Sequence, residues 1–308
     1  MKVISKIKRV GFIPLLYKLW NRICIKDKTI LSYCDRNGAY CYLKHHHKVT
    51  YQQEVPFKQG EREKVIWTCW LQGEENAPKI VQVAIQSMRK WCGDYRVIVI
   101  TDENLHQYVQ LPDYIEAKRK AGIIPLAHYS DLVRLSLLKQ YGGVWLDSTI
   151  YVTNYLPHYM LDCPVFCFKT APVAHEIMGN SLLASDKGNP LISAMLTYLL
   201  DYWRKENVLV SYSVFHVAWD IVVHSSEYLN RLWENIPYVT FHTHCIMRKE
   251  MNNPWSQTRY NDICAMTPLH KFTYKFAEYH IDTTKQGTFY DVLVNRAPGY
   301  SIRLRNSR

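Results

Sequence analysis

The stretch from Ala127 to Asp147 restricts the possible folds more than any other part of the sequence. Its first part, Ala127–Tyr141, repeats apolar side chains at helical spacing and ends at Gly142-Gly143, a pair that stops a helix. The short apolar segment Val144–Asp147 follows directly and is typical of a buried strand. A helix that turns straight into a strand indicates an α/β protein. The predicted apolar stripe of the helix consists of Leu132, Val133, Leu135 and Leu138.

The same alternation of strands and helices extends over most of the chain from about residue 64. Strands are expected at Lys64–Trp70, Tyr95–Thr101 and Val165–Phe168, and helices at Pro78–Trp91, 189–206 and 212–224. The later residues are expected to form short strands or loops. This order predicts a mostly parallel central sheet flanked by helices, with ligands at the carboxyl ends of the strands. We therefore divide the chain into an N-terminal segment, 1–63, and an α/β domain, 64–308.

The positive charge of the chain is concentrated at its N-terminus. The 308 residues carry a net charge of +11, and residues 1–28 hold eight cationic side chains and one acidic one, which leaves only +4 for the rest. A body this mildly basic argues against a nucleic-acid-binding protein. Residues 1–28 also repeat apolar side chains at helical spacing, which favours a basic amphipathic helix on an anionic membrane surface. The alternative is a surface helix packed on its own domain.

Other sequence features predict a cytoplasmic protein. No segment has the roughly 18 uninterrupted apolar residues of a membrane span, and the N-terminus lacks the apolar core and cleavage site of a secretory signal. Nine cysteines without a Cys-x-x-Cys pair favour scattered reduced thiols and argue against a structural zinc site. Residues 29–63 are interpreted as a poorly periodic connector. We expect His45, His46 and His47 within it to be solvated, because consecutive side chains point in different directions.

Charged side chains gather around the helix and strand of the Ala127–Asp147 stretch. Asp131 and Arg134 are three residues apart, so they share one face of the predicted helix. Asp147 stands at the carboxyl end of the strand, where open α/β sheets bind ligands. An arginine fork, two carboxylates and a glycine turn in one crevice suit a polyhydroxyl or phosphate ligand. The alternative is an ordinary Asp–Arg helix pair beside a helix end.

The pattern Asp131-x-x-Arg134 followed by Tyr141-Gly-Gly-x-Trp-x-Asp147 resembles the sugar-donor signature of retaining GT-A glycosyltransferases. The closest resemblance is to the capsular polysaccharide synthesis proteins, relatives of glycosyltransferase family 32, and the wider group includes the large glucosylating toxins. The resemblance runs from about residue 64 to 275 and implies a GT-A nucleotide-sugar-binding fold.

The resemblance also implies roles for particular residues. Asp131 and Arg134 would hold hydroxyls of the donor sugar, and Asp147 would be the first carboxylate of an Asp-x-Asp metal motif. Thr149 stands where most relatives have the second Asp, and a hydroxyl is a weaker ligand than a carboxylate. A divalent metal, Mn²⁺ or Mg²⁺, is still expected, with Asp147 and Thr149 at the metal and with diphosphate oxygens and water completing its shell.

Two further segments carry parts of the implied site. Trp70, at the exit of the first strand, would stack on the nucleotide base, with core packing as the alternative. Because Trp67 and Trp70 are an odd number of residues apart, they should face opposite sides of the sheet, so one can be core and the other site. Lys271 would meet the diphosphate as a point charge, and His270 would add a donor or a metal ligand. The alternative for both is a solvated basic loop, and Asn180-Ser181 resembles the segment on the family's acceptor side.

The function implied by the resemblance is hexosyl transfer with retention from a nucleotide sugar, with UDP-hexose as the leading donor. The acceptor would be a lipid-linked saccharide in the synthesis of capsular or other surface polysaccharide. The basic N-terminal segment agrees with a peripheral location at the inner face of the cell membrane. Two alternatives stay open: a toxin-like enzyme that glycosylates a protein, and a non-catalytic scaffold with the same fold, which Thr149 would favour.

Overall fold

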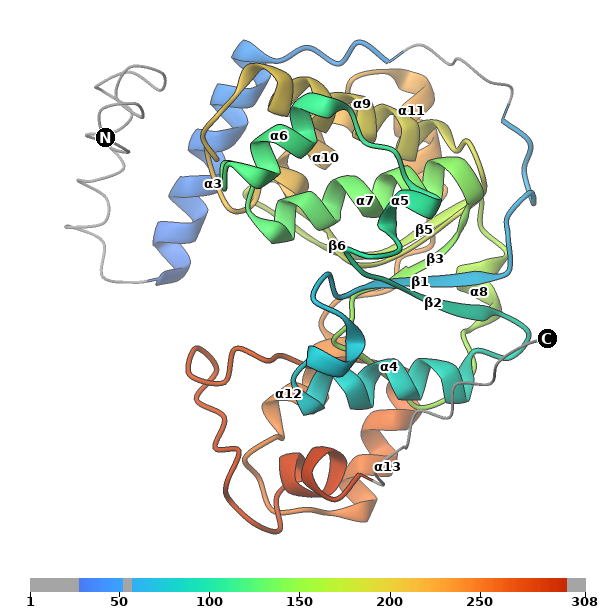
Figure 1. Ribbon diagram of the computed structural model, residues 1–308, viewed down its shortest axis with the longest axis vertical. Helices are drawn as coiled ribbons and strands as arrows, with labels where there is room; N and C mark the ends of the chain where they lie inside the picture. Colours follow the sequence, from blue (N-terminus) through green and yellow to red (C-terminus); the bar gives the residue numbers. More distant parts are fainter. Residues whose placement is uncertain (1–27, 52–56, 298–308) are drawn as a thin grey trace.

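The computed structural model describes residues 28–51 and 57–297, with a five-stranded sheet at its centre (Figure 1). The strands are β1 Val65–Cys69, β2 Arg96–Ile100, β3 Gly143–Leu146, β5 Val165–Val173 and β6 Glu176–Ser185. They lie in the order β2-β1-β3-β6-β5. β1 is parallel to β2 and β3, whereas β6 is antiparallel to β3 and β5, so β6 alone opposes the other strands of this sheet. The predicted α/β class with a mostly parallel central sheet is confirmed.

Helices cover both faces of this sheet (Figure 1). On one face lie α7, Leu126–Tyr141, and α10, Val214–Val223, both in contact with the strands, and α9, Pro190–Lys205, packs on these two helices. On the other face lies α4, Lys79–Trp91, whose first turn follows Pro78. Proline suits this position because its fixed φ matches a helix start. The predicted helices at Pro78–Trp91, Ala127–Tyr141, 189–206 and 212–224 are thus confirmed.

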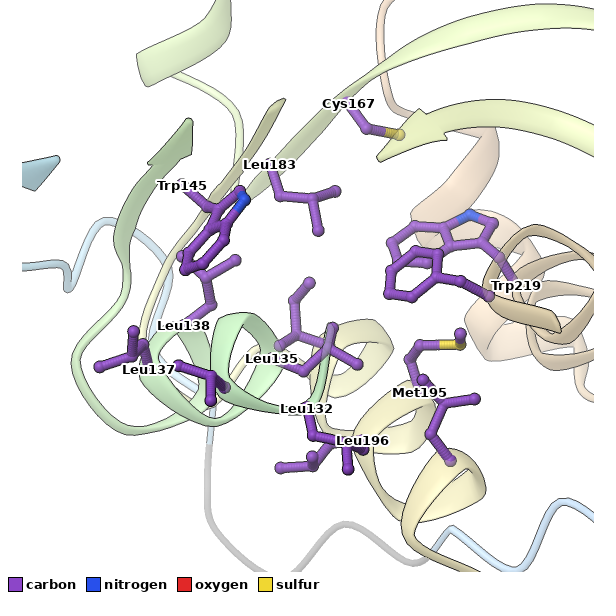
Figure 2. Packing of buried hydrophobic residues seen from close by; sticks show 14 of the residues in the cluster. Leu132, Leu135, Leu137, Leu138, Trp145, Cys167, Leu183, Met195, Leu196 and Trp219 are labelled. Carbon is purple, nitrogen blue, oxygen red and sulfur yellow. The ribbon is translucent and has the colours of Figure 1, made fainter. Parts of the chain in front are cut away.

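Large apolar side chains fill the layer between α7 and the sheet. Figure 2 shows the side chains that meet there, including Leu132, Leu135, Trp145, Leu183, Met195 and Trp219. All six are at most 1% exposed. Burying a side chain of this size contributes about 1.5–3 kcal/mol. This layer therefore fixes the position of α7, on which two candidate site residues stand.

The turn between α7 and β3 depends on its two glycines. Gly142 and Gly143 have φ angles of 69° and 98°, which side-chain-bearing residues rarely adopt. A Cβ atom on Gly143 would lie 2.7 Å from the carbonyl oxygen of Val65. The carbonyl of Gly142 accepts a hydrogen bond of 3.0 Å from Nε1 of Trp67, which lies in the core. The glycine pair thus lets the chain reverse sharply beside β1, as the sequence predicts.

The other helices and a second, smaller sheet complete the described chain. The helices are α3 Lys28–His46, α5 Leu105–Tyr108, α6 Asp113–Lys120, α8 His158–Leu161, α11 Glu227–Glu234, α12 Ile246–Lys249 and α13 Gln257–Met266, with short helical turns at Glu74–Asn76, Thr243–Cys245 and Asp291–Asn295. The second sheet pairs β4, Ile150–Val152, with β7, Leu269–Lys271, in antiparallel fashion. A second apolar core lies below the main sheet in Figure 1, where α4 meets the C-terminal segments around α12 and α13.

Three expectations from the sequence are wrong. The predicted connector, 29–63, is helical over its first part, because α3 packs on α10 and buries Ala39 and Leu43. His47 is buried at 3% exposure among Tyr198 and Tyr202, although His45 and His46 are exposed as expected. The region after residue 224 contains helices as well as loops.

The strand predicted at Val165–Phe168 is longer than expected. It continues to Val173 as β5 and forms a hairpin with β6, which the sequence did not predict.

No helix of residues 28–51 and 57–297 is long and apolar enough to cross a membrane. The predicted amphipathic helix spans residues 1–28, of which 1–27 lie outside the described residues. Its membrane contact stays a prediction, and so does the division of the chain at residue 63.

Candidate active site

A cavity of about 370 Å³ opens where β1 and β3 end. Its walls come from the segment after β1 with Trp70, from α7 with Asp131 and Arg134, from the segment after β3 with Asp147, and from β7 and the loop behind it with Lys271. The structure therefore brings these five predicted site residues to one cavity. Its place agrees with the expectation that an open α/β sheet binds ligands at the carboxyl ends of its strands.

Arg134 lines this cavity and is only 4% exposed. Its Nη1 donates to the backbone carbonyl of Asn180 at 2.7 Å and lies 3.2 Å from Oδ1 of Asp131. Its Nη2 donates to Oδ1 of Asp147 at 2.9 Å. The guanidinium also lies over the ring of Trp145, with 4.9 Å between Cζ and the ring centroid. A buried arginine held on this many sides is a rigid fork that orients both carboxylates.

Asp147 accepts hydrogen bonds on both of its carboxylate oxygens. Oδ1 receives Nη2 of Arg134 and Nε1 of Trp145, each at 2.9 Å, and Oδ2 receives Nζ of Lys271 at 2.6 Å. Burial alone would raise the pKa of Asp147, but the charges of Lys271 and Arg134 and the hydrogen bonds of Lys271 and Trp145 hold its pKa below the ordinary value. Asp147 is therefore ionised at neutral pH, although its side chain is only 24% exposed.

Asp131 has the opposite electrostatic setting. Its side chain is 8% exposed, and burial raises its pKa to about 7, against the influence of Arg134 and with a smaller contribution from the charge of Asp147. Nδ2 of Asn180 lies 3.4 Å from Oδ1, and Nδ1 of His128 lies 3.8 Å from Oδ2. A carboxyl group that is half-protonated near neutral pH can both donate and accept hydrogen bonds, which suits a ligand hydroxyl.

The two tryptophans of the first strand face different surroundings, as their spacing predicts. Trp67 is 1% exposed and belongs to the main core. Trp70 lines the cavity, and its ring meets that of Tyr274 edge to face at 5.2 Å between centroids. Nε1 of Trp70 is buried without a hydrogen-bond partner among the described residues. Of the two, Trp70 is the aromatic ring placed to meet a ligand.

β7 likewise separates its two candidate residues. Lys271 lines the cavity and reaches Asp147, whereas His270 is fully buried and does not line it. Nε2 of His270 lies 3.1 Å from Oγ1 of Thr153, and burial lowers the pKa of His270 to about 4. The structure therefore does not bring His270 to the site where it was predicted as a donor or metal ligand. The alternation of neighbouring side chains along a strand explains the difference.

The residues around Asp147 fit a divalent cation poorly. Ser148 and Thr149 line the cavity beside Asp147, and they offer hydroxyls where magnesium and manganese prefer carboxylates. The carboxylate of Asp147 already faces Lys271 and Arg134. Within residues 28–51 and 57–297, no group of three His, Cys, Asp or Glu side chains is placed to share a metal ion. The Mn²⁺ or Mg²⁺ predicted from the sequence therefore stays a prediction that rests on one carboxylate.

Several residues that line the cavity were not found from the sequence. Tyr212, Tyr274 and Tyr279 surround the cavity and are 67%, 44% and 41% exposed. Arg248 lies over the ring of Tyr279 with 4.4 Å between Cζ and the centroid, and Nζ of Lys275 lies 5.5 Å from the ring centroid of Tyr212. Tyr274 and Lys275 stand close to Lys271 in the sequence, whereas Tyr212, Tyr279 and Arg248 stand in no motif. For the three tyrosines, the high aromatic content of the chain, 13%, is a further signal in the sequence.

The two residues of the segment predicted for the acceptor side, Asn180 and Ser181, lie in different surroundings. Asn180 lines the cavity through its contacts with Arg134 and Asp131. Ser181 is 3% exposed and does not line it, because its Oγ lies 3.1 Å from Nε2 of the buried His244.

The fold and the cavity define an α/β protein with a cavity lined by carboxylates, cations and aromatic rings. Sequence comparison assigns its family. The chain belongs to the capsular polysaccharide synthesis protein family, which it matches over residues 28–293. The resemblance to the capsular polysaccharide synthesis proteins is thereby confirmed.

Individual relatives are more distant. The chain is 26% identical to the O-glycosyltransferase braB of Annulohypoxylon truncatum over 160 residues, which are 46% of this chain and 38% of that protein. It is 29% identical to the O-glycosyltransferase PaGT of Phomopsis amygdali over 99 residues, 29% of this chain and 24% of that one. The chain thus spans less than two fifths of the length of either relative. Among solved structures, the PaToxG glycosyltransferase matches 87% of this chain and 95% of its own, at 15% identity and a TM-score of 0.42.

Proposed function

We propose that the chain is a glycosyltransferase that moves a hexose from a UDP-hexose to a lipid-linked saccharide, with retention, in the synthesis of capsular or other surface polysaccharide. Membership of the capsular polysaccharide synthesis family supports the class of reaction. The observation that carries the proposal is the series of contacts Asp131–Arg134–Asp147–Lys271, whose members all line one cavity. This series combines hydroxyl-binding groups with a phosphate-binding cation, the two kinds of group that a nucleotide sugar requires.

Each part of the donor has a matching part of the cavity. The flat ring of Trp70 suits the uracil base, since bases stack on aromatic side chains. Asp131 and Arg134 suit the sugar hydroxyls, because one carries a carboxyl group that donates or accepts and the other a fixed donor fork. The ammonium of Lys271 suits the diphosphate. Because the donor set around Asp147 fits a divalent cation poorly, the metal predicted from the sequence is left out of this proposal.

In the proposed transfer, the bond between the anomeric carbon and the diphosphate oxygen breaks, and its electron pair leaves with the diphosphate. The acceptor oxygen bonds to the anomeric carbon on the face that the diphosphate leaves, so the configuration is retained. The acceptor proton passes to a diphosphate oxygen, so no separate protein base is required. The protein's part is to hold the acceptor hydroxyl on the face of the sugar that the diphosphate leaves and to neutralise the charge that develops on the leaving group.

The acceptor is proposed from the family and from the rim of the cavity. The exposed rings of Tyr212, Tyr274 and Tyr279 offer flat apolar surfaces with polar tips, which suit the faces and hydroxyls of a saccharide. The basic amphipathic sequence of residues 1–28 would hold the enzyme at the inner face of the cell membrane, where a lipid-linked acceptor lies. Deleting residues 1–27 should reduce sedimentation with anionic vesicles, and unchanged sedimentation would remove the membrane part of the proposal.

The donor is tested by incubating the protein with a panel of UDP- and GDP-sugars and following thermal stability and slow donor hydrolysis. Selective stabilisation by one UDP-hexose, with release of UDP, is the expected result. The same panel with Asp147→Asn shows whether hydrolysis arises at the cavity. If no sugar nucleotide stabilises the protein or is hydrolysed, the result would favour the non-catalytic scaffold. Transfer to a purified protein in preference to a lipid-linked saccharide would favour a toxin-like enzyme.

A further inference from the structure

The contacts of Asp147 raise the question of what neutralises a bound diphosphate. A divalent cation at this carboxylate would have to replace Lys271, whose Nζ lies 2.6 Å from Oδ2. It would also meet the charge of Arg134, whose Nη2 lies 2.9 Å from Oδ1. Like charges this close inside a partly buried site repel strongly. The position that a metal would take is thus already held by cations of the protein itself.

The neighbouring oxygen ligands do not compensate for this competition. Thr149 and Ser148 are neutral, and both are less than 10% exposed. The other carboxyl group of the cavity, Asp131, meets the other terminal nitrogen of Arg134, with 3.2 Å between its Oδ1 and Nη1. Magnesium at a phosphate ligand is usually held by one or two free carboxylates together with the phosphate oxygens. Only the carboxylate of Asp147 is available, and it is already paired.

Besides Arg134, three cations converge on the same cavity from different segments. Lys271 stands on β7, Lys275 on the loop that follows it, and Arg248 on α12. The Lys271 side chain is 19% exposed, and that of Lys275 is 46% exposed and lies 3.5 Å from Glu278. Among the described residues that line the cavity, four are cationic and two acidic, a surplus of two positive charges. This surplus has the sign and the place required to bind a diphosphate without added metal.

We propose that Lys271, Lys275 and Arg248 bind and neutralise the diphosphate of the donor, so that the enzyme acts without a bound divalent metal. This inference rests on the proposed function. When the bond between the anomeric carbon and the diphosphate oxygen breaks, the electron pair moves to that oxygen, and the ammonium and guanidinium groups stabilise the charge there. Arg248 suits this task because its planar fork can bind two phosphate oxygens at once, whereas the lysines act as point charges.

The first test measures UDP binding by calorimetry in buffer with a chelator and again with Mn²⁺ or Mg²⁺. The expected dissociation constants agree within about twofold, well below the tenfold change that corresponds to 1.4 kcal/mol. Binding that is at least about tenfold weaker in chelator and restored by Mn²⁺ would overturn the inference while leaving the proposed function intact. Failure to bind UDP in either buffer would overturn both.

The second test separates the diphosphate from the base by comparing UDP with uridine. Arg248→Ala and Lys275→Ala should weaken UDP binding roughly ten- to hundredfold, because each removes a charged contact, and should leave uridine binding unchanged. The matched control is Lys249→Ala, which removes an exposed cation of α12 that does not line the cavity. Equal UDP affinity in Arg248→Ala, Lys275→Ala and the control would overturn the assigned roles.

Lys271 needs a charge-conserving variant, because its contact with Asp147 also contributes to the local structure. Lys271→Gln should lose UDP affinity while uridine affinity persists, and Lys271→Arg should recover most of it in chelator. If Lys271→Gln bound UDP as well as the wild type in chelator, Lys271 would not hold the diphosphate. Persisting uridine affinity reports that the cavity is still folded in each variant.

Discussion

Replacing Asp147 by Asn tests the role of its negative charge, because Asn has nearly the same shape as Asp but is neutral. The amide can still accept hydrogen bonds from Arg134 and Trp145 on one oxygen, but it presents an NH₂ group to the ammonium of Lys271. The lost charge-assisted hydrogen bond contributes about 1.5–3 kcal/mol. Because the Asp147 side chain is about a quarter exposed, we take the lower half of that range, about 2 kcal/mol, for the loss in free energy of unfolding. The variant should therefore stay folded, since domains have about 5–15 kcal/mol of stability.

The effect of Asp147→Asn on turnover should be far larger than its effect on folding. Without the negative charge, Arg134 and Lys271 lose the group that orients them, and turnover should fall about 10²- to 10³-fold, as when a preorganised donor is removed from an active site. The matched control is Asp186→Asn, which breaks a buried ion pair with Arg62 away from the cavity. It should lower thermal stability and leave turnover unchanged. Donor hydrolysis and thermal unfolding, measured on both variants, decide the point. Turnover of Asp147→Asn within about threefold of wild type, or equal losses in both variants, would refute the reasoning.

Three further predictions address the base, the turn and the pH dependence. Trp70→Ala should weaken uridine binding by about 1–3 kcal/mol, the contribution of one stacked base, whereas Trp70→Phe should keep part of this contribution. Calorimetry measures the affinity, and an unchanged value in Trp70→Ala would assign Trp70 to packing alone. Gly143→Ala should lower the free energy of unfolding by about 1–3 kcal/mol in denaturant titrations, because Gly143 has a φ of 98° and an added Cβ would lie 2.7 Å from the carbonyl oxygen of Val65. The control Gly188→Ala, with a φ of 69° and open space around it, should lose less stability. Burial raises the pKa of Asp131 to about 7, so between about pH 4 and 7 the folded protein keeps a proton that the unfolded chain has lost. The stability that Asp131 contributes is complete below pH 4 and is lost as the pH rises to about 7, so the stability of wild type relative to Asp131→Asn should fall over this window. A difference in stability between the two proteins that does not change with pH would contradict the raised pKa of Asp131. The lowered pKa of His128 makes stability rise with pH instead, but this effect is common to both proteins and cancels in the comparison.

Local signals were sufficient for the parts of the fold that the sequence predicted correctly. Local sequence patterns predict the helix Leu126–Tyr141, the glycine pair that ends it and the strand that follows. The spacing of Asp131, Arg134 and Asp147 along these elements was therefore enough to predict that they lie at one cavity. Helix α3 was missed because its apolar side chains do not recur at a clear helical spacing. Ala39 and Leu43 are buried only through its packing on α10, which no local pattern records.

The hairpin of β5 and β6 was missed for a different reason. Its turn residues, Ala174 and His175, have φ angles of 49° and 62° without being glycine or asparagine, so the usual turn signal is absent. Long-range contacts hold this turn instead. Nδ1 of His175 lies 2.7 Å from Oδ2 of Asp220, and its ring stacks on Tyr40 at 3.6 Å. Tertiary structure, and not local preference, determines the conformation here.

The charge arrangement of the cavity likewise depends on a pairing that the sequence does not show. β4 begins three residues after Asp147, and its pairing with β7 sets Ile150 opposite Lys271. That register brings a lysine 124 residues away in sequence to within 2.6 Å of the carboxylate. The same pairing turns His270, its neighbour, into the core. A one-residue shift of β7 would exchange the two side chains and place a neutral imidazole at Asp147. The two-stranded sheet therefore decides whether a cation or an imidazole faces Asp147 in the cavity, as much as the helix α7 decides where Asp131 and Arg134 lie.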